Sequence, residues 1–233
     1  MKVIALLCMV GLCVGLLFSG NAMAKTLFFD DFEAGADKWP AMPTLSIEED
    51  PDKPGNSVLA FDAIADNANV DAFFMEGYEE LTDYTMKARF NIVGESANYA
   101  VAGLIVRAEA VGQNMVIEPA VNRQGVPQMV NVFDRGAAWA IVADGEAELE
   151  MNKWYELSVT VADVNLTVFV DGKLVAEFND VPYAKGGFGI RQWASKALYD
   201  DVEVYDAGGS DMSPVEPGGK LTTAWGALRT GSL

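Results

Sequence analysis

Hydrophobic and polar residues alternate along much of this chain with a period of two, the repeat of a β-strand. In Trp154–Ala162, a tyrosine, a leucine and two valines occupy one face, and three polar residues occupy the other. Tyr84–Ile92 alternates in the same way, with Lys87 and Arg89 on its polar face. One buried face and one wet face are typical of antiparallel sheets. Between residues 25 and 206, no stretch shows sustained helical periodicity.

Twelve short apolar runs, separated by Gly, Asn, Asp or Pro, are predicted as strands. They are Leu27–Phe32, Val58–Asp62, Tyr84–Ile92, Tyr99–Ala108, Met115–Val121, Gln128–Asp134, Ala138–Ala143, Trp154–Ala162, Leu166–Val170, Lys173–Phe178, Gly187–Gln192 and Leu198–Tyr205. A dozen strands without helices predict an all-β fold, a two-sheet antiparallel jelly-roll sandwich. Ala34–Asn56, with four prolines, is predicted as a loop, and Asp62–Tyr78 is weakly patterned. Loops of this length often carry a functional site.

Two Asp-Gly pairs predict hairpins, because Asp-Gly favours the positive φ angles of a type I′ turn. Asp171-Gly172 joins two of the predicted strands. Asp144-Gly145 joins Ala138–Ala143 to Glu146–Glu150.

The first 24 residues have the features of a secretory signal peptide. Lys2 precedes an apolar run, and Ala22-Met23-Ala24 matches an A-x-A cleavage signal; an uncleaved anchor is the alternative. We therefore expect a secreted or periplasmic protein, with one domain over 25–206 and no membrane span after cleavage. Residues 207–233 are predicted as a flexible linker and short C-terminal tail, which either frays or docks to a protein partner through Trp225.

The amino-acid composition excludes several classes of catalytic and binding site. The chain has 16 Lys and Arg, 34 Asp and Glu, and no His, giving a net charge of −18. Without His there is no Ser-His-Asp triad, no Cys-His dyad and no His-ligated zinc. The acidic balance argues against nucleic-acid binding, which needs a Lys and Arg footprint. Both cysteines, Cys8 and Cys13, lie in the predicted signal peptide. The functions that remain are catalysis by carboxylates, binding of a hard cation, or a role without catalysis.

Several motifs occur together in a familiar order: Leu27–Phe32 followed by Trp39, Ala102–Arg107, Trp154–Leu157, Val168–Val175, Gly186–Arg191 and Tyr199–Val202. This ordered set resembles the concanavalin A-like, laminin-G-like jelly-roll domains of bacterial secreted proteins. That superfamily includes glycan-binding modules, glycoside hydrolases and a branch named for 3-keto-disaccharide hydrolysis, so the resemblance implies the fold but does not fix the function. Val101-Ala102-Gly103 stands where that branch usually has Asn-Ser-Gly, which argues against the same activity here.

The segment Glu146-Ala147-Glu148-Leu149-Glu150 is similar to the E-x-D-x-E strand of family 16 glycosidases. The resemblance implies that Glu146 and Glu150 would be the nucleophile and the acid/base of a retaining glycosidase. Glu148 stands where that family has Asp. We therefore favour the alternative, in which these carboxylates form the solvated face of an edge strand.

Two pairs of aspartates are candidates for a structural calcium site. Asp30-Asp31 lies near the first predicted strand and Asp200-Asp201 on the last, and in this fold the terminal strands usually run side by side. Carboxylates and carbonyls are the ligands that Ca²⁺ prefers. The alternative is two solvated acidic strand ends.

A third set of residues is predicted to bind the ligand. Sugar-binding faces combine aromatic rings with a few polar groups. Tyr99, Arg107, Trp139, Arg191 and Trp193 meet that description. We therefore predict a carbohydrate-binding module without catalytic activity. A glycoside hydrolase or lyase is one alternative, and a structural or adhesion domain of the cell envelope is another.

Overall fold

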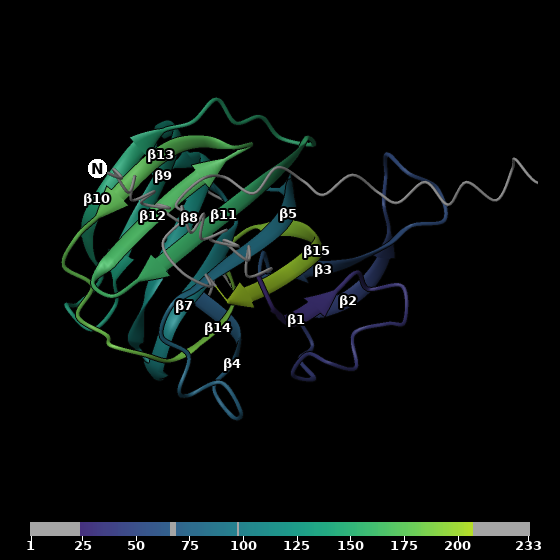
Figure 1. Ribbon diagram of the computed structural model, residues 1–233. Coiled ribbons are helices and arrows are strands. Elements are labelled where there is room, and N and C mark those ends of the chain that lie inside the picture. Colours follow the sequence, from purple (N-terminus) through teal and green to yellow (C-terminus); the bar gives the residue numbers. More distant parts are fainter. Residues whose placement is uncertain (1–23, 66–68, 97, 207–233) are drawn as a thin grey trace, which may run out of the picture.

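Fifteen strands and no helix make up the described part of the chain, which is residues 24–65, 69–96 and 98–206 of a computed structural model (Figure 1). Every strand pairing is antiparallel. The predicted cleavage signal and the C-terminal tail lie outside the described residues, apart from Ala24. No helix in the described ranges is long and apolar enough to cross a membrane.

The first sheet has the order β13-β12-β11-β5-β15-β3-β2, with β1 also paired to β15. Its strands are β1 (Thr26–Asp30), β2 (Leu45–Glu49), β3 (Ser57–Asp62), β5 (Tyr84–Gly94), β11 (Trp154–Ala162), β12 (Asn165–Val170), β13 (Lys173–Phe178) and β15 (Lys196–Asp206). The two terminal strands, β1 and β15, therefore lie side by side, as the sequence predicted.

The second sheet has the order β10-β9-β8-β7-β14-β4, with β6 also paired to β8. Its strands are β4 (Asn69–Phe74), β6 (Tyr99–Val101), β7 (Gly103–Ala110), β8 (Gln113–Arg123), β9 (Val126–Asp134), β10 (Ala140–Glu146) and β14 (Gly187–Trp193). The two sheets stack to form a sandwich, one behind the other in the view of Figure 1. This confirms the predicted all-β jelly-roll class.

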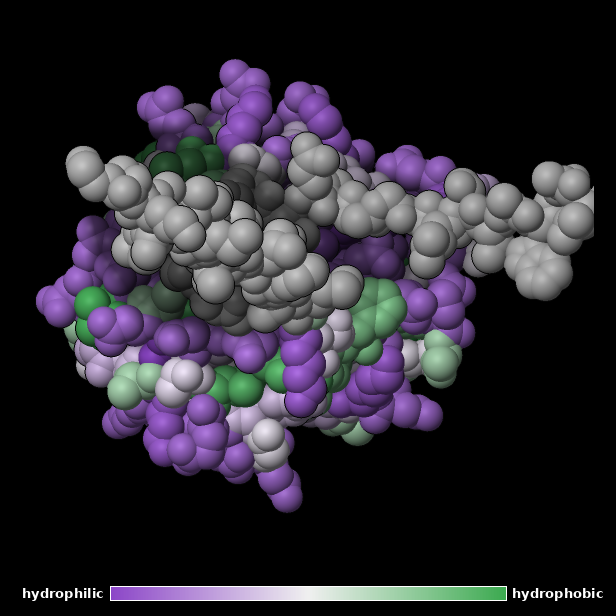
Figure 2. All heavy atoms as spheres, viewed as in Figure 1, coloured by the Kyte–Doolittle hydropathy of each residue, from purple (hydrophilic) through white to green (hydrophobic). Residues whose placement is uncertain are grey.

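The core lies between the sheets and follows from the alternation in the sequence. The inward residues of β11 are buried at every second position, and β5 buries Met86, Ala88 and Phe90 opposite them. Burial of apolar surface of this kind is the main favourable term in folding. The polar positions lie outside, and hydrophilic residues predominate among the coloured atoms in Figure 2.

Two strands occur where the sequence indicated loop or weak pattern, and one predicted hairpin is wrong. β2 lies inside the predicted loop Ala34–Asn56, and β4 lies inside Asp62–Tyr78. Asp171-Gly172 does turn between β12 and β13, with φ of 48° and 73°. Asp144-Gly145, in contrast, continues β10 without a turn and pairs with β9.

Gly145 is needed for a different reason. A Cβ atom at this position would lie 1.7 Å from the carbonyl oxygen of Val175 on β13. The backbones of β10 and β13, the edge strands of the two sheets, meet there. The glycine therefore serves a close approach between sheets, a role that a sequence pattern cannot distinguish from a turn.

Candidate functional site

A row of polar residues crosses the second sheet on the face that points away from the core. Asp71 on β4 pairs with Arg191 on β14, and Arg191 pairs with Gly103 on β7. Leu104 pairs with Ile117, which sets Gly103 beside Glu118 of β8, and Glu118 pairs with Asn131 of β9. We call Asp71, Arg191, Gly103, Glu118 and Asn131 the polar row. Five strands thus place these residues at one level of the sheet, and four of the five residues carry a polar side chain.

Gly103 leaves the space that the row needs. A Cβ atom here would lie 3.1 Å from the carbonyl oxygen of Arg191 and 3.4 Å from its Cβ. Because β7 presents no side chain at this level, Arg191 reaches across it to the carboxylate of Glu118. The glycine is therefore part of the site without touching a ligand itself.

Five charged residues form a continuous chain of ion pairs along the row. Arg135 pairs with Asp71, whose other oxygen lies 3.9 Å from Nε of Arg191. Arg191 donates through Nη1 to Glu118, and Nε of Arg123 donates to the second oxygen of Glu118 at 2.8 Å. We call these five residues the charged chain. It holds three cations and two anions.

Aromatic rings cover the charged chain. The guanidinium of Arg191 lies 4.5 Å from the ring centre of Trp139 and 5.2 Å from that of Trp193. Arg135 contacts the same Trp139 ring at 4.6 Å. The ring of Tyr99 stacks on Trp193 with 5.3 Å between centres. Cation–π contacts of this kind gain strength as the cation loses water.

The centre of the charged chain is shielded from solvent. The side chains of Arg191 and Glu118 are each 1% exposed. Burial lowers the pKa of Arg191, and the negative charge of Glu118 opposes that shift. An arginine stays protonated in a protein, so a buried positive charge is held here by its neighbours.

Several buried polar atoms of the row have no hydrogen-bond partner among the described residues. They are Nε and Nη2 of Arg191, Oδ1 of Asp71 and Nδ2 of Asn131. Buried polar groups in native proteins nearly always have a partner, and an unpaired one costs about 1–3 kcal/mol. Unpaired atoms gathered at one place are what a binding site keeps for its ligand.

Trp139 belongs to a short connection between β9 and β10 with unusual backbone geometry. Ala138 and Trp139 have φ of 58° and 62°, in the left-handed region that non-glycine residues seldom occupy. The ring packs edge-on against Phe133 at 5.9 Å and joins a small apolar cluster with Ile105 and Val116. Such strain tends to be kept where function needs it.

The structure brings together four of the five residues predicted to bind the ligand, namely Tyr99, Trp139, Arg191 and Trp193. Arg107 lies elsewhere. Its guanidinium donates to the carbonyl oxygens of Tyr183 and Asp163, each at 3.0 Å, in loops that close one end of the sandwich. Its φ of 52° marks a bulge that breaks the simple alternation along β7. Arg107 therefore lies outside the cluster formed by the other four residues.

Sequence reasoning missed Asp71, Glu118, Arg123 and Arg135. A signal for Asp71 existed, because Val70, Ala72 and Phe74 alternate with Asp71 and Phe73 in a short strand pattern. The isolated acid Glu118 inside the apolar run of β8 was a second signal, since a lone charge in such a strand needs a partner. The two arginines carry no local signal, because only the fold brings them to the row.

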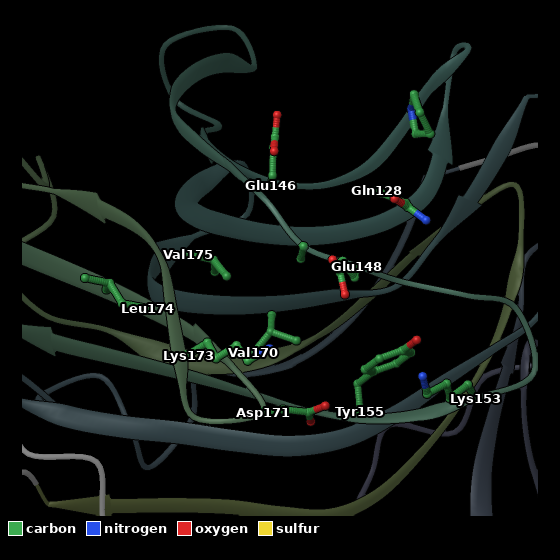
Figure 3. A pocket seen from close by; sticks show the side chains of 12 residues that line it. Gln128, Glu146, Glu148, Lys153, Tyr155, Val170, Asp171, Lys173, Leu174 and Val175 are labelled. Carbon is green, nitrogen blue, oxygen red and sulfur yellow. The ribbon is translucent and has the colours of Figure 1, made fainter.

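The acidic motif at 146–150 begins on β10, the edge strand that pairs with β9. β10 ends at Glu146, so Glu148 and Glu150 follow the strand instead of continuing it. Glu146 and Glu148 line a pocket of about 670 Å³ together with Lys153, Tyr155 and other residues of both sheets. Figure 3 shows the two carboxylates pointing apart.

Glu150 is not among the residues that line this pocket; its carboxylate lies 3.6 Å from Nζ of Lys153 and its side chain is 69% exposed. The paired-carboxylate prediction for Glu146 and Glu150 is untested and stays a prediction. The exposed side chains agree with the solvated alternative.

The four aspartates of the calcium prediction divide into buried and exposed members. Asp30 is buried and accepts from Nε1 of Trp39 at 2.9 Å and from Nζ of Lys38 at 3.1 Å. Asp200 is buried and accepts from Nδ2 of Asn56 and from Nη1 of Arg89.

Asp201 lies 3.6 Å from Arg89, and Asp31 accepts from the backbone of Glu33. Within the described ranges, no group of three acidic or cysteine side chains converges on one point. Calcium binding remains a prediction.

The two antiparallel sheets, with the polar row on the face of one of them, define a concanavalin A-like jelly-roll sandwich. The chain belongs to the 3-keto-α-glucoside-1,2-lyase-like domain family, whose model matches residues 29–205. This confirms the resemblance found in the sequence.

Known proteins share parts of this chain or its fold. Levanase of Bacillus subtilis (strain 168) is 27% identical over 70 residues, and this match covers 30% of the chain but only 10% of levanase. A Bacillus subtilis protein of unknown function with a galectin-like fold superposes with a TM-score of 0.58 and 13% identity, over 78% of this chain and 96% of that one.

Domain 4 of AbnA, a GH43 extracellular arabinanase from Geobacillus stearothermophilus solved in complex with arabinotriose, has a TM-score of 0.52 and 11% identity, over 78% and 93% of the two chains. At these identities, the two solved structures show the fold alone.

Proposed function

We propose that the protein is a secreted or periplasmic carbohydrate-binding module, and that the polar row with its aromatic cover is the glycan site. The observation that carries this proposal is the meeting of Arg191 and Glu118 with the rings of Trp139 and Trp193 on one face of the sheet. A sugar ring presents an apolar face to aromatic rings and hydroxyl groups to charged side chains, so it suits both parts of the site.

The arrangement of the carboxylates supports binding over catalysis. Both oxygens of Glu118 accept hydrogen bonds from arginines, so this carboxylate is already engaged within the protein. Binding of arabinotriose to the related domain of the arabinanase agrees with a module of this kind. The family name favours a second function, a hydrolase or lyase acting on a glycan. Release of new reducing ends that is lost in Glu118→Gln would support that enzyme.

Binding is tested by affinity electrophoresis and calorimetry with levan, arabinan and other polysaccharides, including acidic ones. Trp193→Ala should weaken binding of a recognised glycan by about ten-fold or more, because loss of an aromatic stack on a ring removes roughly 1–2 kcal/mol. Trp154→Ala is the matched control, since Trp154 also lies beside an arginine but on the other sheet.

Folding of each variant is checked by its thermal unfolding. Equal loss of affinity in the Trp193 and Trp154 variants would argue against this site. Failure of the wild-type protein to bind any glycan would favour the structural or adhesion role.

A further inference from the structure

Arg191 has an unused pair of donors at the centre of the site. Its Nη1 donates to Glu118, whereas Nε and Nη2 have no hydrogen-bond partner among the described residues. These two nitrogens form one edge of the guanidinium plane, and that edge matches the two oxygens of a carboxylate. The side chain is 1% exposed, so bulk solvent does not reach these two donors.

The one carboxylate of the row near this edge is held away from it. Asp71 has one oxygen paired with Arg135, and its other oxygen lies 3.9 Å from Nε of Arg191, beyond hydrogen-bonding distance. The amide nitrogen of Asn131 on the same row is a further unpaired donor. Three of the four unpaired atoms of the row are therefore donors, and a ligand must supply acceptors.

The balance of charges in the site also favours a ligand that supplies acceptors. The charged chain contains three arginines and two carboxylates, and so carries an excess of one positive charge. The whole protein has a net charge of −18 and only six arginines, so half of its arginines lie in this one cluster. Arg191 at the centre is buried, whereas the side chains of Arg135 and Arg123 at the ends are 12% and 18% exposed. A bound anion at the centre would compensate the excess positive charge. Neutral hydroxyl groups cannot provide that compensation.

From these observations, and resting on the proposed function, we infer that the ligand is an acidic glycan. A carboxylate of one sugar unit binds side-on to Nε and Nη2 of Arg191. Arg191 is thus the residue that selects an acidic sugar over a neutral one. The ring of Trp139 lies over the face of the guanidinium, 4.5 Å from its centre, and the carboxylate would bind in the guanidinium plane.

The experiment compares matched ligands. Calorimetry is carried out on the full chain in 0.15 M salt (about the physiological value) with short oligomers of galacturonate, glucuronate and alginate. Each oligomer is compared with its own carboxyl-reduced, neutral form. At least one acidic oligomer should bind roughly ten-fold or more tightly than its reduced partner, as expected for a charge-assisted bidentate pair.

Arg191→Lys keeps the positive charge but removes the planar pair of donors. It should lower the affinity for the acidic oligomer by about ten-fold while changing the affinity for the reduced form much less. Arg89→Lys is the matched control, because Arg89 also pairs with an aspartate and lies over a tryptophan ring, but on the first sheet. If Arg191→Lys does not fold, the comparison of the acidic and reduced oligomers on the wild-type protein still tests whether the ligand is acidic.

The outcomes separate this inference from the function on which it rests. Equal affinity for acidic and reduced oligomers, or binding of neutral glycans alone, overturns the acidic-ligand inference and leaves the carbohydrate-binding function standing. If no acidic or neutral glycan binds, the proposed function itself fails. A preference for the acidic form that Arg191→Lys abolishes and Arg89→Lys retains supports both.

Discussion

Two arginines are buried in the described part of the chain, and their surroundings assign them different roles. Arg191 lies under aromatic rings with Nε and Nη2 unpaired, whereas Arg107 donates through both Nη1 and Nη2 to backbone carbonyl groups of two loops and leaves only Nε unpaired. Each side chain is at most 1% exposed. Burial alone therefore does not identify a functional arginine; the partners of its donors do.

Arg107→Met should separate the two roles. The variant loses charge-assisted bonds to Tyr183 and Asp163, so the free energy of unfolding should fall by about 2–4 kcal/mol. The glycan affinity of the folded variant should equal that of the wild type, because Arg107 lies outside the charged chain. Urea unfolding and calorimetry measure the two quantities. Reduced affinity at unchanged stability would return Arg107 to the binding site.

A second prediction at this scale concerns Asp200, whose pKa is raised by burial although Asn56 and Arg89 act against the shift. A raised pKa means that the folded protein holds this proton more tightly than the unfolded chain does. The stabilising contribution is thus complete below the unfolded pKa of about 3.9 and is lost as the pH rises through the folded value. Asp200→Asn removes the titration.

The wild type should therefore gain stability relative to Asp200→Asn as the pH falls from 7 towards 4. Urea unfolding of both proteins across this range measures the difference, in which the other carboxylates largely cancel. A difference that stays constant, or that moves the other way, contradicts the assignment.

At the scale of the strand, Gly145 and Gly172 illustrate two uses of one dipeptide. Gly172 has a positive φ in a true turn, whereas Gly145 is extended and faces the backbone of Val175. Gly145→Ala should cost about 3 kcal/mol or more, because the added carbon overlaps a backbone atom. Gly172→Ala should cost about 1–2 kcal/mol from the left-handed conformation alone. Thermal and urea unfolding measure the loss of stability in each variant. A larger loss in Gly172→Ala than in Gly145→Ala would refute this explanation.

Individual strands were predictable from the sequence wherever apolar and polar residues alternate over a sufficient length. β11 and β5 are such cases. β2 and β4 were not found, because each has at most six residues and lies among loop-forming residues. Because β4 carries Asp71, missing this strand also meant missing a residue of the candidate site. A short edge strand gives the weakest pattern and yet forms part of the site.

At the scale of the whole molecule, the site is a product of the sheet order. The charged chain draws on residues from Asp71 to Arg191, and the pairing of β4, β14, β7 and β8 sets Asp71, Arg191 and Glu118 at one level. Tyr99, Trp139, Trp193 and Arg191 could be proposed from the residue types that sugar-binding faces combine. Their carboxylate partners could not, because the contacts depend on which strands are neighbours, and periodicity carries no information about that order.

The same geometry predicts what the C-terminal segment contributes. Every residue of the charged chain and of its aromatic cover precedes β15, and the last described strand ends at Asp206. A protein that ends at Asp206 should therefore keep its melting temperature and bind glycan within about two-fold of the full chain, since a two-fold change is only about 0.4 kcal/mol. Thermal unfolding and calorimetry on both forms test this. A lower melting temperature would show that residues 207–233 pack on the sandwich, and weaker binding alone would assign Trp225 a part in the site.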